Sequence, residues 1–385
     1  MQSAPRPDKR SLLQPVVSPP PPYRSHTSHV APSHPHPCPP PAPPVPPPAL
    51  TDAQKAFFLT HGFIHLPGCF SRSASDAFTA ALWPRLGMSP TDKSTWHTER
   101  TNMPSSSNIV PIAEFAPKAW AAICELLGGE ERVSEKTRTW GDAFIVNLGV
   151  EGQGEVPPRE LDGWHVDGDF FIHFLDSPEQ ALLVIPLFSD IAPGGGGTAI
   201  CTDGIGVVAK HLHDNPAGVT PWMHARGTPE PTGPNTTRLA FFRAIVQDPA
   251  LARDASFHEM TGQVGDVYLL HPLMVHSATK NATRVPRVIT NPPVALKAPF
   301  RLSVDDASAD GGFSLVEQKT LRELGFPGGL PGWKIEGGRE GFVPRRIKRQ
   351  EEMRAKERER LAELQARAAA EVQPQAQAQV QAVGA

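Results

Sequence analysis

Short strand-like segments, separated by turn-forming residues, occupy the chain between residues 139 and 296. Each segment is rich in β-branched, aliphatic or aromatic residues, and Gly, Pro, Asp or Asn stands between one segment and the next. This pattern is typical of an antiparallel sandwich or jelly roll, and it disfavours strands that alternate with helices around a parallel sheet. The predicted strands fall within 139–150, 163–175, 180–191, 198–205, 238–246, 256–263, 265–278 and 287–296.

Helical patterns precede these strands. Thr51 is a favourable N-cap for a helix over 52–62, which Gly62 would end, and further helical patterns cover 71–86 and 113–129. Helices first and strands later predict a mainly β fold with helices, in which N-terminal helices buttress a β-barrel.

The two ends of the chain differ in composition from its middle. Residues 1–50 hold 18 of the 44 prolines, too many for a segment that must bury a core. Near the other end, charges and helix formers dominate, with too few apolar residues for a core-facing stripe. The predicted organisation is a disordered Pro-rich arm (1–50), one domain (51–344) with a helical preface (51–130) and a β-barrel (about 138–296), a charged solvated helix (345–372) and a low-complexity tail (373–385).

Charge and cysteine usage limit the expected partners. The formal net charge of −3 gives no basic field for nucleic acid or an anionic membrane, so neither is expected as a partner. The four cysteines form no CxxC motif, and no secretory signal is recognised, which predicts a cytoplasmic protein. "PRRIKR" (344–349) leaves a nuclear location open. "PPAPPVPPP" (40–48) has the composition that SH3- or WW-type domains bind, although a linker is the simpler interpretation.

The stretch "WHVDGD" (164–169) sets an imidazole and a carboxylate among aromatic residues. Such groups are not buried without a partner, which is either a hydrogen-bond network or a metal ion. On a strand, His165 and Asp167 project to the same face, so that both could bind one ion. A third ligand would come from a distant strand, and the late segment 265–278 offers His271 and His276.

Two imidazoles and one carboxylate form the facial triad of non-haem Fe(II) oxygenases, which leaves coordination positions for a keto-acid co-substrate. The far carboxylate of that co-substrate needs a cation, and the planar fork of arginine suits it best. Arg287 begins the strand after His276 and is the first candidate. Arg284, in the preceding turn, is its competitor and is expected to be exposed.

Three segments together resemble the phytanoyl-CoA dioxygenase (PhyH)-like family of Fe(II)/2-oxoglutarate-dependent dioxygenases, over about residues 51–295. The segments are "LTDAQKAFFLTHGFIHLPG" (50–68), "WHVDGD" (164–169) and "GDVYLLHPLMVHSATKNATRVPR" (265–287). The resemblance implies a double-stranded β-helix, a jelly roll of the cupin type. It also implies Fe(II), 2-oxoglutarate and O2 as cofactors, and hydroxylation of a small organic or lipid-like molecule with release of succinate and CO2.

By the same resemblance, His165, Asp167 and His276 are the metal ligands and Arg287 binds the distal carboxylate of 2-oxoglutarate. Two features depart from the family pattern. The glycine-rich turn 194–197 is not followed by a Gly-Ser-His segment. The position two residues after the distal histidine, where the family often has a hydroxyl, is alanine. Ser277, or a residue on another strand, would then supply that hydroxyl.

Other interpretations stay open at this point. Asp169 competes with Asp167 as the ligand, although in a "DGD" turn it would cap backbone amides. His173 and His258 are expected to be structural, with His173 as a second candidate for the substrate mouth. The triad also suits a zinc hydrolase, for which Glu259 is the candidate base. The remaining alternative is a catalytically inactive barrel that acts as a binding module.

Overall fold

The computed structural model describes residues 48–228, 239–308, 312–344 and 346–383. The predicted Pro-rich arm therefore lies outside the described residues, apart from its last three positions. The helices are α1 (Asp52–His61), α2 (Arg72–Thr79), α3 (Leu82–Leu86), α4 (Ile112–Phe115), α5 (Pro117–Leu127), α6 (Gly204–Asp214), α7 (Ala240–Gln247), α8 (Leu315–Glu323) and α9 (Arg346–Val383).

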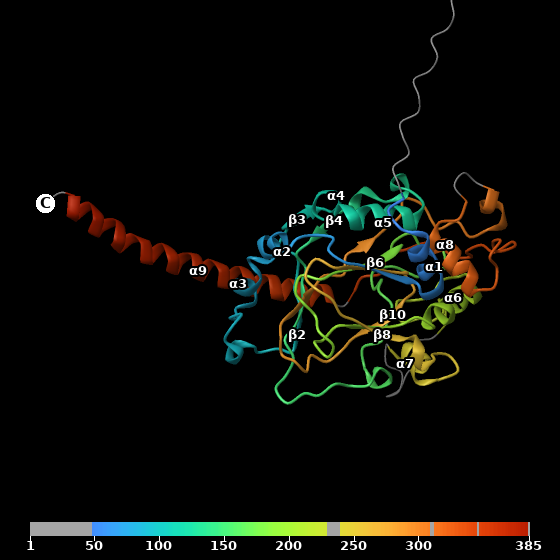
Figure 1. Ribbon diagram of the computed structural model, residues 1–385, viewed down its shortest axis with the longest axis horizontal. Helices are drawn as coiled ribbons and strands as arrows, with labels where there is room; N and C mark the ends of the chain where they lie inside the picture. The colour runs from blue at the N-terminus through green and yellow to red at the C-terminus, as the bar shows by residue number, and fades with distance from the viewer. Residues whose placement is uncertain (1–47, 229–238, 309–311, 345, 384–385) are drawn as a thin grey trace, which may run out of the picture. The chain divides into compact units, whose positions relative to one another are not determined.

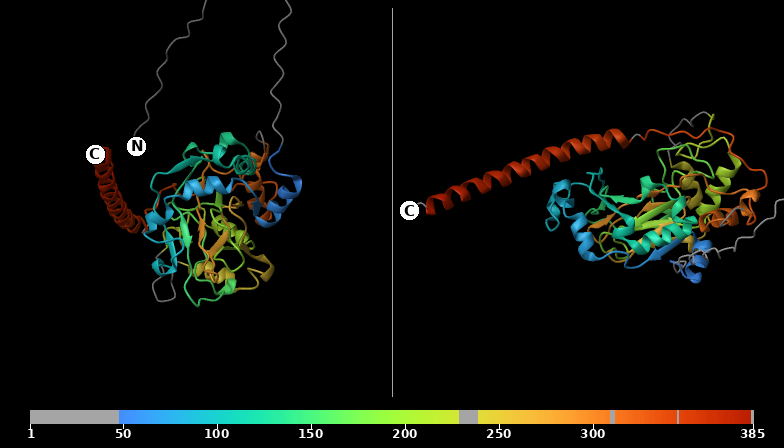
Figure 2. Two further views of the ribbon diagram at one scale, coloured as in Figure 1. Left: turned by 60° about the vertical axis from the view of Figure 1, so that its left-hand side comes forward. Right: turned by 90° about the horizontal axis from the view of Figure 1, so that it is seen from above.

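The strands are short, and every pair between them is antiparallel (Figures 1 and 2). Among the described residues they form four sheets, in the orders β1-β9-β6-β12, β10-β7-β8, β11-β5-β2 and β3-β4, and these ladders do not close into one barrel. The strands are β1 (Phe63–Leu66), β2 (Arg100–Asn102), β3 (Ile109–Pro111), β4 (Thr139–Gly141), β5 (Ile145–Asn147), β6 (Leu182–Pro186), β7 (Thr198–Cys201), β8 (Phe257–Met260), β9 (Val267–Leu270), β10 (Val275–Ala278), β11 (Arg287–Ile289) and β12 (Pro293–Val294).

The predicted start and end of α1 are confirmed. The Thr51 side chain accepts a hydrogen bond from the backbone of Gln54, whose own side chain bonds back to the cap. At the other end Gly62 has a φ of 75°, a left-handed conformation that glycine adopts without strain. The next predicted helix is divided into α2 and α3. The third is divided into α4 and α5, because Pro117 starts a new helix.

Three predicted strands are wrong in whole or in part, and two of them contain helical residues. From Ala240 onward the predicted strand 238–246 is instead helix α7, whose buried residues Phe242, Ile245 and Val246 recur at the spacing of one helix face. The segment 198–205 is a strand only as far as Cys201, after which the chain continues into α6.

Helix α8 begins with a capping box of Ser314 and Glu317. A serine followed three residues later by a glutamate is a helix-start signal that is visible in the sequence.

The segment 163–175 does not form the regular strand that the sequence predicts. It makes only isolated antiparallel bridges, at His165, Phe171 and His173, and runs as irregular backbone between them. The glycine in "DGD" explains part of this, because Gly168 has a φ of 108°. The directions of the His165 and Asp167 side chains are therefore not set by the alternation of a regular strand.

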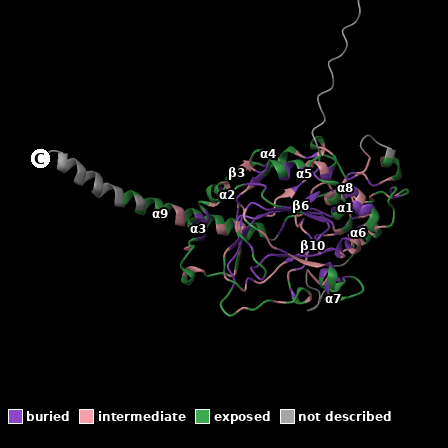
Figure 3. Cartoon of the chain, viewed as in Figure 1, coloured by how far each residue is buried: buried purple, intermediate pink, exposed green. Residues whose placement is uncertain are grey.

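Buried apolar residues from the sheets and the helices form one core cluster. In Figure 3 the buried residues gather in the interior of the fold. Helix α8 contacts both α1 and α6, and the three helices lie together on one side of this core (Figure 1). None of the helices in the described ranges is apolar over a length sufficient to cross a membrane.

Helix α9 contacts the rest of the fold beside α3 (Figures 1 and 2). There Glu357 is buried and pairs with the buried Arg85, which also bonds Asp142. The prediction of a solvated helix is therefore wrong at this turn. A scarcity of apolar residues in the helix does not exclude a buried ion pair.

Candidate metal centre

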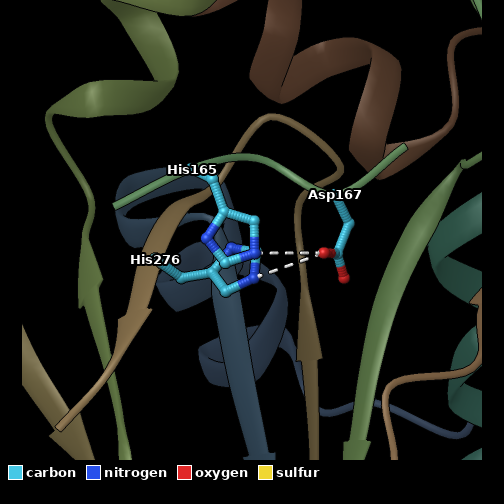
Figure 4. Close-up of side chains that lie close together, drawn as sticks. All are labelled: His165, Asp167 and His276. Carbon is cyan, nitrogen blue, oxygen red and sulfur yellow. Dashed lines mark ion pairs between the residues drawn. The ribbon is translucent and has the colours of Figure 1, made fainter. Parts of the chain in front are cut away.

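His165 and His276 lie opposite each other in a short antiparallel bridge (Figure 4). The backbone N–H of each residue donates to the carbonyl oxygen of the other, both at 2.9 Å. Residues opposed in this way direct their side chains to the same face. The two imidazole centroids are accordingly only 4.3 Å apart. The ligand segment is thus held against β10 at the histidine itself.

Each imidazole is oriented by its own neighbouring backbone. Nδ1 of His165 donates to the carbonyl of Gly163 at 2.6 Å, and Nδ1 of His276 donates to the carbonyl of Met274 at 2.9 Å. A carbonyl oxygen can only accept, so the ring proton lies on Nδ1 in both residues. Nε2 then carries the lone pair, as metal-binding histidines require.

Asp167 completes the group (Figure 4). Its Oδ1 lies 3.3 Å from Nε2 of His165 and 3.7 Å from Nε2 of His276. Asn291 donates to the other oxygen, Oδ2, at 2.9 Å. Adjacent ligands about 2.1 Å from one ion lie roughly 3 Å apart, so a small contraction of this group would suffice to bind a metal.

The charges in the group suit a divalent cation. Burial opposes ionisation of Asp167, but the interactions of its carboxylate with His165, His276 and Asn291 outweigh it and hold the pKa of Asp167 below its usual range. Burial, with a smaller effect of His165, lowers the pKa of His276 to about 4. At neutral pH, His276 is therefore neutral and Asp167 ionised, and these are the states that bind metal ions.

Arg287 lies inside the fold without an anionic partner. Its side chain is 2% exposed, and Nη2 donates to Oγ1 of Thr198 at 2.9 Å. Nε and Nη1 are buried and have no acceptor among the described residues. Burial, together with the charge of Arg100, lowers the pKa of Arg287 to about 9. A buried, incompletely bonded guanidinium of this kind is suited to a carboxylate that comes from outside the chain.

Strand pairing relates this arginine to the triad. Thr198, which accepts from Arg287, pairs with Ala278, two residues after His276 on β10. Residues two apart in a strand, and residues paired across strands, share a face. Thr198 and His276 therefore face the same side of the sheet. The hydrogen bond to Thr198 places the guanidinium of Arg287 on that side as well.

The competing sequence candidates have other partners. Arg284 lies in the turn, with a φ of 51°, and Nη1 lies 3.5 Å from Oε2 of Glu151. It is half-buried rather than exposed as expected, because it stacks on Trp96. Asp169 forms a two-pronged ion pair with Arg346, at 2.7 and 2.8 Å. The prediction that Asp169 caps backbone amides is therefore wrong.

Ser277 does not supply the hydroxyl that the sequence departure called for. It neighbours His276 in β10 and so faces the opposite side of the sheet, where its Oγ lies against Gly163. Thr198, which pairs with Ala278 from the neighbouring strand, places a hydroxyl beside this position. A residue on another strand was the alternative to Ser277. The sequence gives no register between these strands and therefore could not identify Thr198.

Glu259, the candidate base for a zinc hydrolase, lies on the same outer face as Ser277. Both pair with Ala199, so both are directed away from His276. Its carboxylate accepts hydrogen bonds from the backbone N–H groups of Gly194 and Gly197, at 3.2 and 3.3 Å. Glu259 therefore holds the glycine-rich turn and is not placed to act as a base at the triad.

Two other histidines were expected to be structural. His173 is buried, and its Nε2 donates to the carbonyl of Gly168 at 2.7 Å. It also borders a small cavity that reaches Asp167. His258 packs its ring against His61 and Phe63.

Asn291, which binds Asp167, was not predicted from the sequence. It lies four residues after Arg287, and residues four apart in a strand project to the same face, so this spacing could have identified it.

No family model matches the sequence, and no curated protein matches it. Solved structures do match. The epimerase SnoN in complex with Fe3+, alpha ketoglutarate and nogalamycin RO is 16% identical, with a TM-score of 0.35 over 64% of this chain and 83% of that chain. HygX from Streptomyces hygroscopicus, with nickel, 2-oxoglutarate and hygromycin B bound, is 14% identical, with a TM-score of 0.35 over 68% and 94% of the two chains.

The carbocyclase SnoK from nogalamycin biosynthesis is 16% identical, with a TM-score of 0.34 over 78% of this chain and 100% of that chain. TM-scores of this size lie below the level that establishes a shared fold. The functional conclusion therefore depends on the side chains of the site and not on these similarities.

Proposed function

We propose that the chain is a non-haem Fe(II)- and 2-oxoglutarate-dependent dioxygenase that hydroxylates a small organic or lipid-like substrate. The domain 51–344 would carry this activity on the double-stranded β-helix that its sequence resemblance implies. One observation supports the proposal above all others. A group of two imidazoles and a carboxylate shares one face with the buried guanidinium of Arg287, two of whose nitrogens have no acceptor among the described residues.

The residues fit the cofactors. His165, Asp167 and His276 offer two nitrogens and one oxygen, the donor set of the facial triad, and all three ligand atoms lie within 4.8 Å of one another. The unused donors of Arg287 fit the distal carboxylate of 2-oxoglutarate. When bound, iron and 2-oxoglutarate supply the activation of O2: one oxygen atom enters succinate as CO2 leaves, and the other enters a C–H bond of the substrate.

The chain's own residues orient these groups and exclude water. Backbone carbonyls hold both imidazoles with Nε2 toward Asp167, and Asn291 fixes the carboxylate by its second oxygen. Burial keeps His276 neutral, and Arg287 offers the co-substrate a buried cation with unused donors. At neutral pH, Asp167 and His276 are already in the protonation states that metal binding requires.

The test is conversion of 2-oxoglutarate to succinate by the full chain, with Fe(II) and O2, for wild type and Asp167→Ala. Many such enzymes turn over 2-oxoglutarate slowly without substrate, so we expect succinate from wild type and none from Asp167→Ala. Asp169→Ala, which removes the carboxylate paired with Arg346, is the matched control and should keep the activity. Equal activity of Asp167→Ala and wild type would refute the proposal. Tightly bound zinc without 2-oxoglutarate turnover would favour a hydrolase, and absence of metal binding would favour a binding module.

A further inference from the structure

A second arginine lies on the same sheet as Arg287. In the order β11-β5-β2, Arg287 pairs with Asn147, and Asn147 pairs in turn with Arg100 at the start of β2. Residues that are paired across neighbouring strands share a face of the sheet. Arg100 is therefore directed to the same side of this sheet as Arg287. Two strand spacings separate the backbones of the two arginines, which is about 10 Å.

Arg100 and Arg287 also share the lack of a carboxylate partner. In the described part of the chain as far as residue 300, every other arginine forms an ion pair with an aspartate or a glutamate. The acidic residue next to Arg100 in the sequence, Glu99, is itself paired with Lys280 at 3.0 Å. The charge of Arg100 is thus not neutralised by an ion pair with a described residue.

The two guanidinium groups differ in exposure. Arg287 is buried, whereas Arg100 is exposed. Asn147 between them is buried and uncharged, and its side-chain amide is bonded to the carbonyl of Thr279 and to the backbone N–H of Gly149. Burial lowers the pKa of Arg287 most, and the charge of Arg100 lowers it further, so the two cations repel each other. An anion on this face would relieve that repulsion, and it would meet Arg100 first.

We infer that Arg100 is the outer cation of an entry path for 2-oxoglutarate, which attracts the dianion from solution before Arg287 binds its distal carboxylate. The inference rests on the proposed function, because it takes Arg287 as the end of the path. Arg100 acts through its charge and from a distance, so it accelerates association and does not hold the bound molecule. A dianion gains more from this charge than a monoanion does, and Arg100 therefore favours dicarboxylates among competing keto acids.

Coulomb's law gives the size of the effect. A dianion about 10 Å from one positive charge in water, at about 10 mM salt, is attracted strongly enough to raise the association rate constant about threefold. For a monoanion the same charge gives a factor below about two. At about 1 M salt, charges are screened within about 3 Å, and both effects should disappear.

The test is anaerobic stopped-flow absorbance on the full chain loaded with Fe(II). The protein is mixed with 2-oxoglutarate or with 2-oxopentanoate, which has the same carbon chain but lacks the far carboxylate. At about 10 mM salt, Arg100→Gln should lower the association rate constant for 2-oxoglutarate about threefold, lower that for 2-oxopentanoate less, and leave the dissociation rate constants unchanged.

Two further variants serve as controls. Arg100→Lys keeps the charge and should restore the wild-type association rate constant, which it would not do if the guanidinium bound the co-substrate by its planar fork. Arg72→Gln removes an exposed cation from α2, where it pairs with Asp190, and changes the net charge by the same amount. Arg72→Gln should leave both rate constants unchanged.

The outcomes separate this inference from the proposed function. Equal association rate constants for Arg100→Gln and wild type at low salt would overturn the inference and leave the proposed function standing. A loss that persists at about 1 M salt, or that is as large in Arg100→Lys, would overturn it as well, because charge would not be the cause. If wild type itself gives no absorbance change with 2-oxoglutarate at any salt concentration, the proposed function fails and the inference fails with it.

Discussion

The Arg287→Met variant should stabilise the ligand-free protein while it weakens the binding of 2-oxoglutarate. The reason is that Arg287 is buried and, within the part of the chain that the structure describes, has Thr198 as its one hydrogen-bond partner. Burial lowers its pKa from that of a free arginine to about 9. At ~1.36 kcal/mol for each pH unit, this corresponds to an upper bound of about 5 kcal/mol for keeping the charge inside the protein.

The sign of this effect follows from linkage. The folded-state pKa lies below the unfolded-state pKa, so the folded state binds the proton less tightly than the unfolded state does. The penalty is present in full below about pH 9 and fades as the pH rises toward the pKa of arginine in the unfolded chain. At neutral pH, methionine removes the penalty but loses the hydrogen bond to Thr198. We therefore expect the free energy of unfolding to rise by about 1–4 kcal/mol, as when other buried charges are replaced by apolar residues.

Urea unfolding of both proteins without ligands measures this stability, and anaerobic calorimetry with Fe(II) present measures the affinity for 2-oxoglutarate. Loss of a buried charge partner costs about 2–5 kcal/mol of binding, or roughly 30-fold to several thousand-fold in affinity. Arg284→Met is the matched control, since Arg284 pairs with Glu151 in the turn, and it should leave the affinity unchanged. An Arg287→Met protein that is less stable and still binds 2-oxoglutarate normally would show that the arginine is structural.

Further predictions concern the metal ligands and helix α9. Asn291→Ala removes the hydrogen bond to Oδ2 of Asp167 and should weaken metal binding about 10- to 100-fold in a chelator competition; unchanged affinity would show that Asn291 does not position the carboxylate. Because burial lowers the pKa of His276 to about 4, metal should stay bound from neutral pH to about pH 5 and be lost as the pH falls through 4; loss near pH 6.5 would contradict this assignment. Glu357→Ala leaves the buried Arg85 with one carboxylate fewer and should lower the free energy of unfolding by about 3 kcal/mol, with faster hydrogen exchange at the start of α9; a change under ~0.5 kcal/mol would mean that the pair does not hold the helix.

The sequence indicated which residues converge but not how the backbone brings them together. His165 and Asp167 lie side by side as their spacing predicts, yet 163–175 is irregular backbone and not a strand. The contact with His276 depends on a single bridge between distant segments. A pattern read along the chain cannot supply such a pairing, so the third ligand could be chosen only through the family resemblance.

The residues that sequence reasoning missed share one property. Thr198 and Asn291 have roles defined by a hydrogen-bond partner on another segment and not by local spacing. Helix α7 was mistaken for a strand for a different reason. Its short apolar run suits either structure, and only the burial of Phe242, Ile245 and Val246 shows the helical period.

The central claim is that this triad binds iron together with 2-oxoglutarate, and an anaerobic absorption spectrum tests it most directly. Fe(II) and then 2-oxoglutarate are added to wild type and to His165→Ala, and the visible spectrum is recorded. Chelation of iron by the keto acid predicts a metal-to-ligand charge-transfer band in wild type that is missing in His165→Ala. No band in wild type, or an equal band in both proteins, would contradict the account.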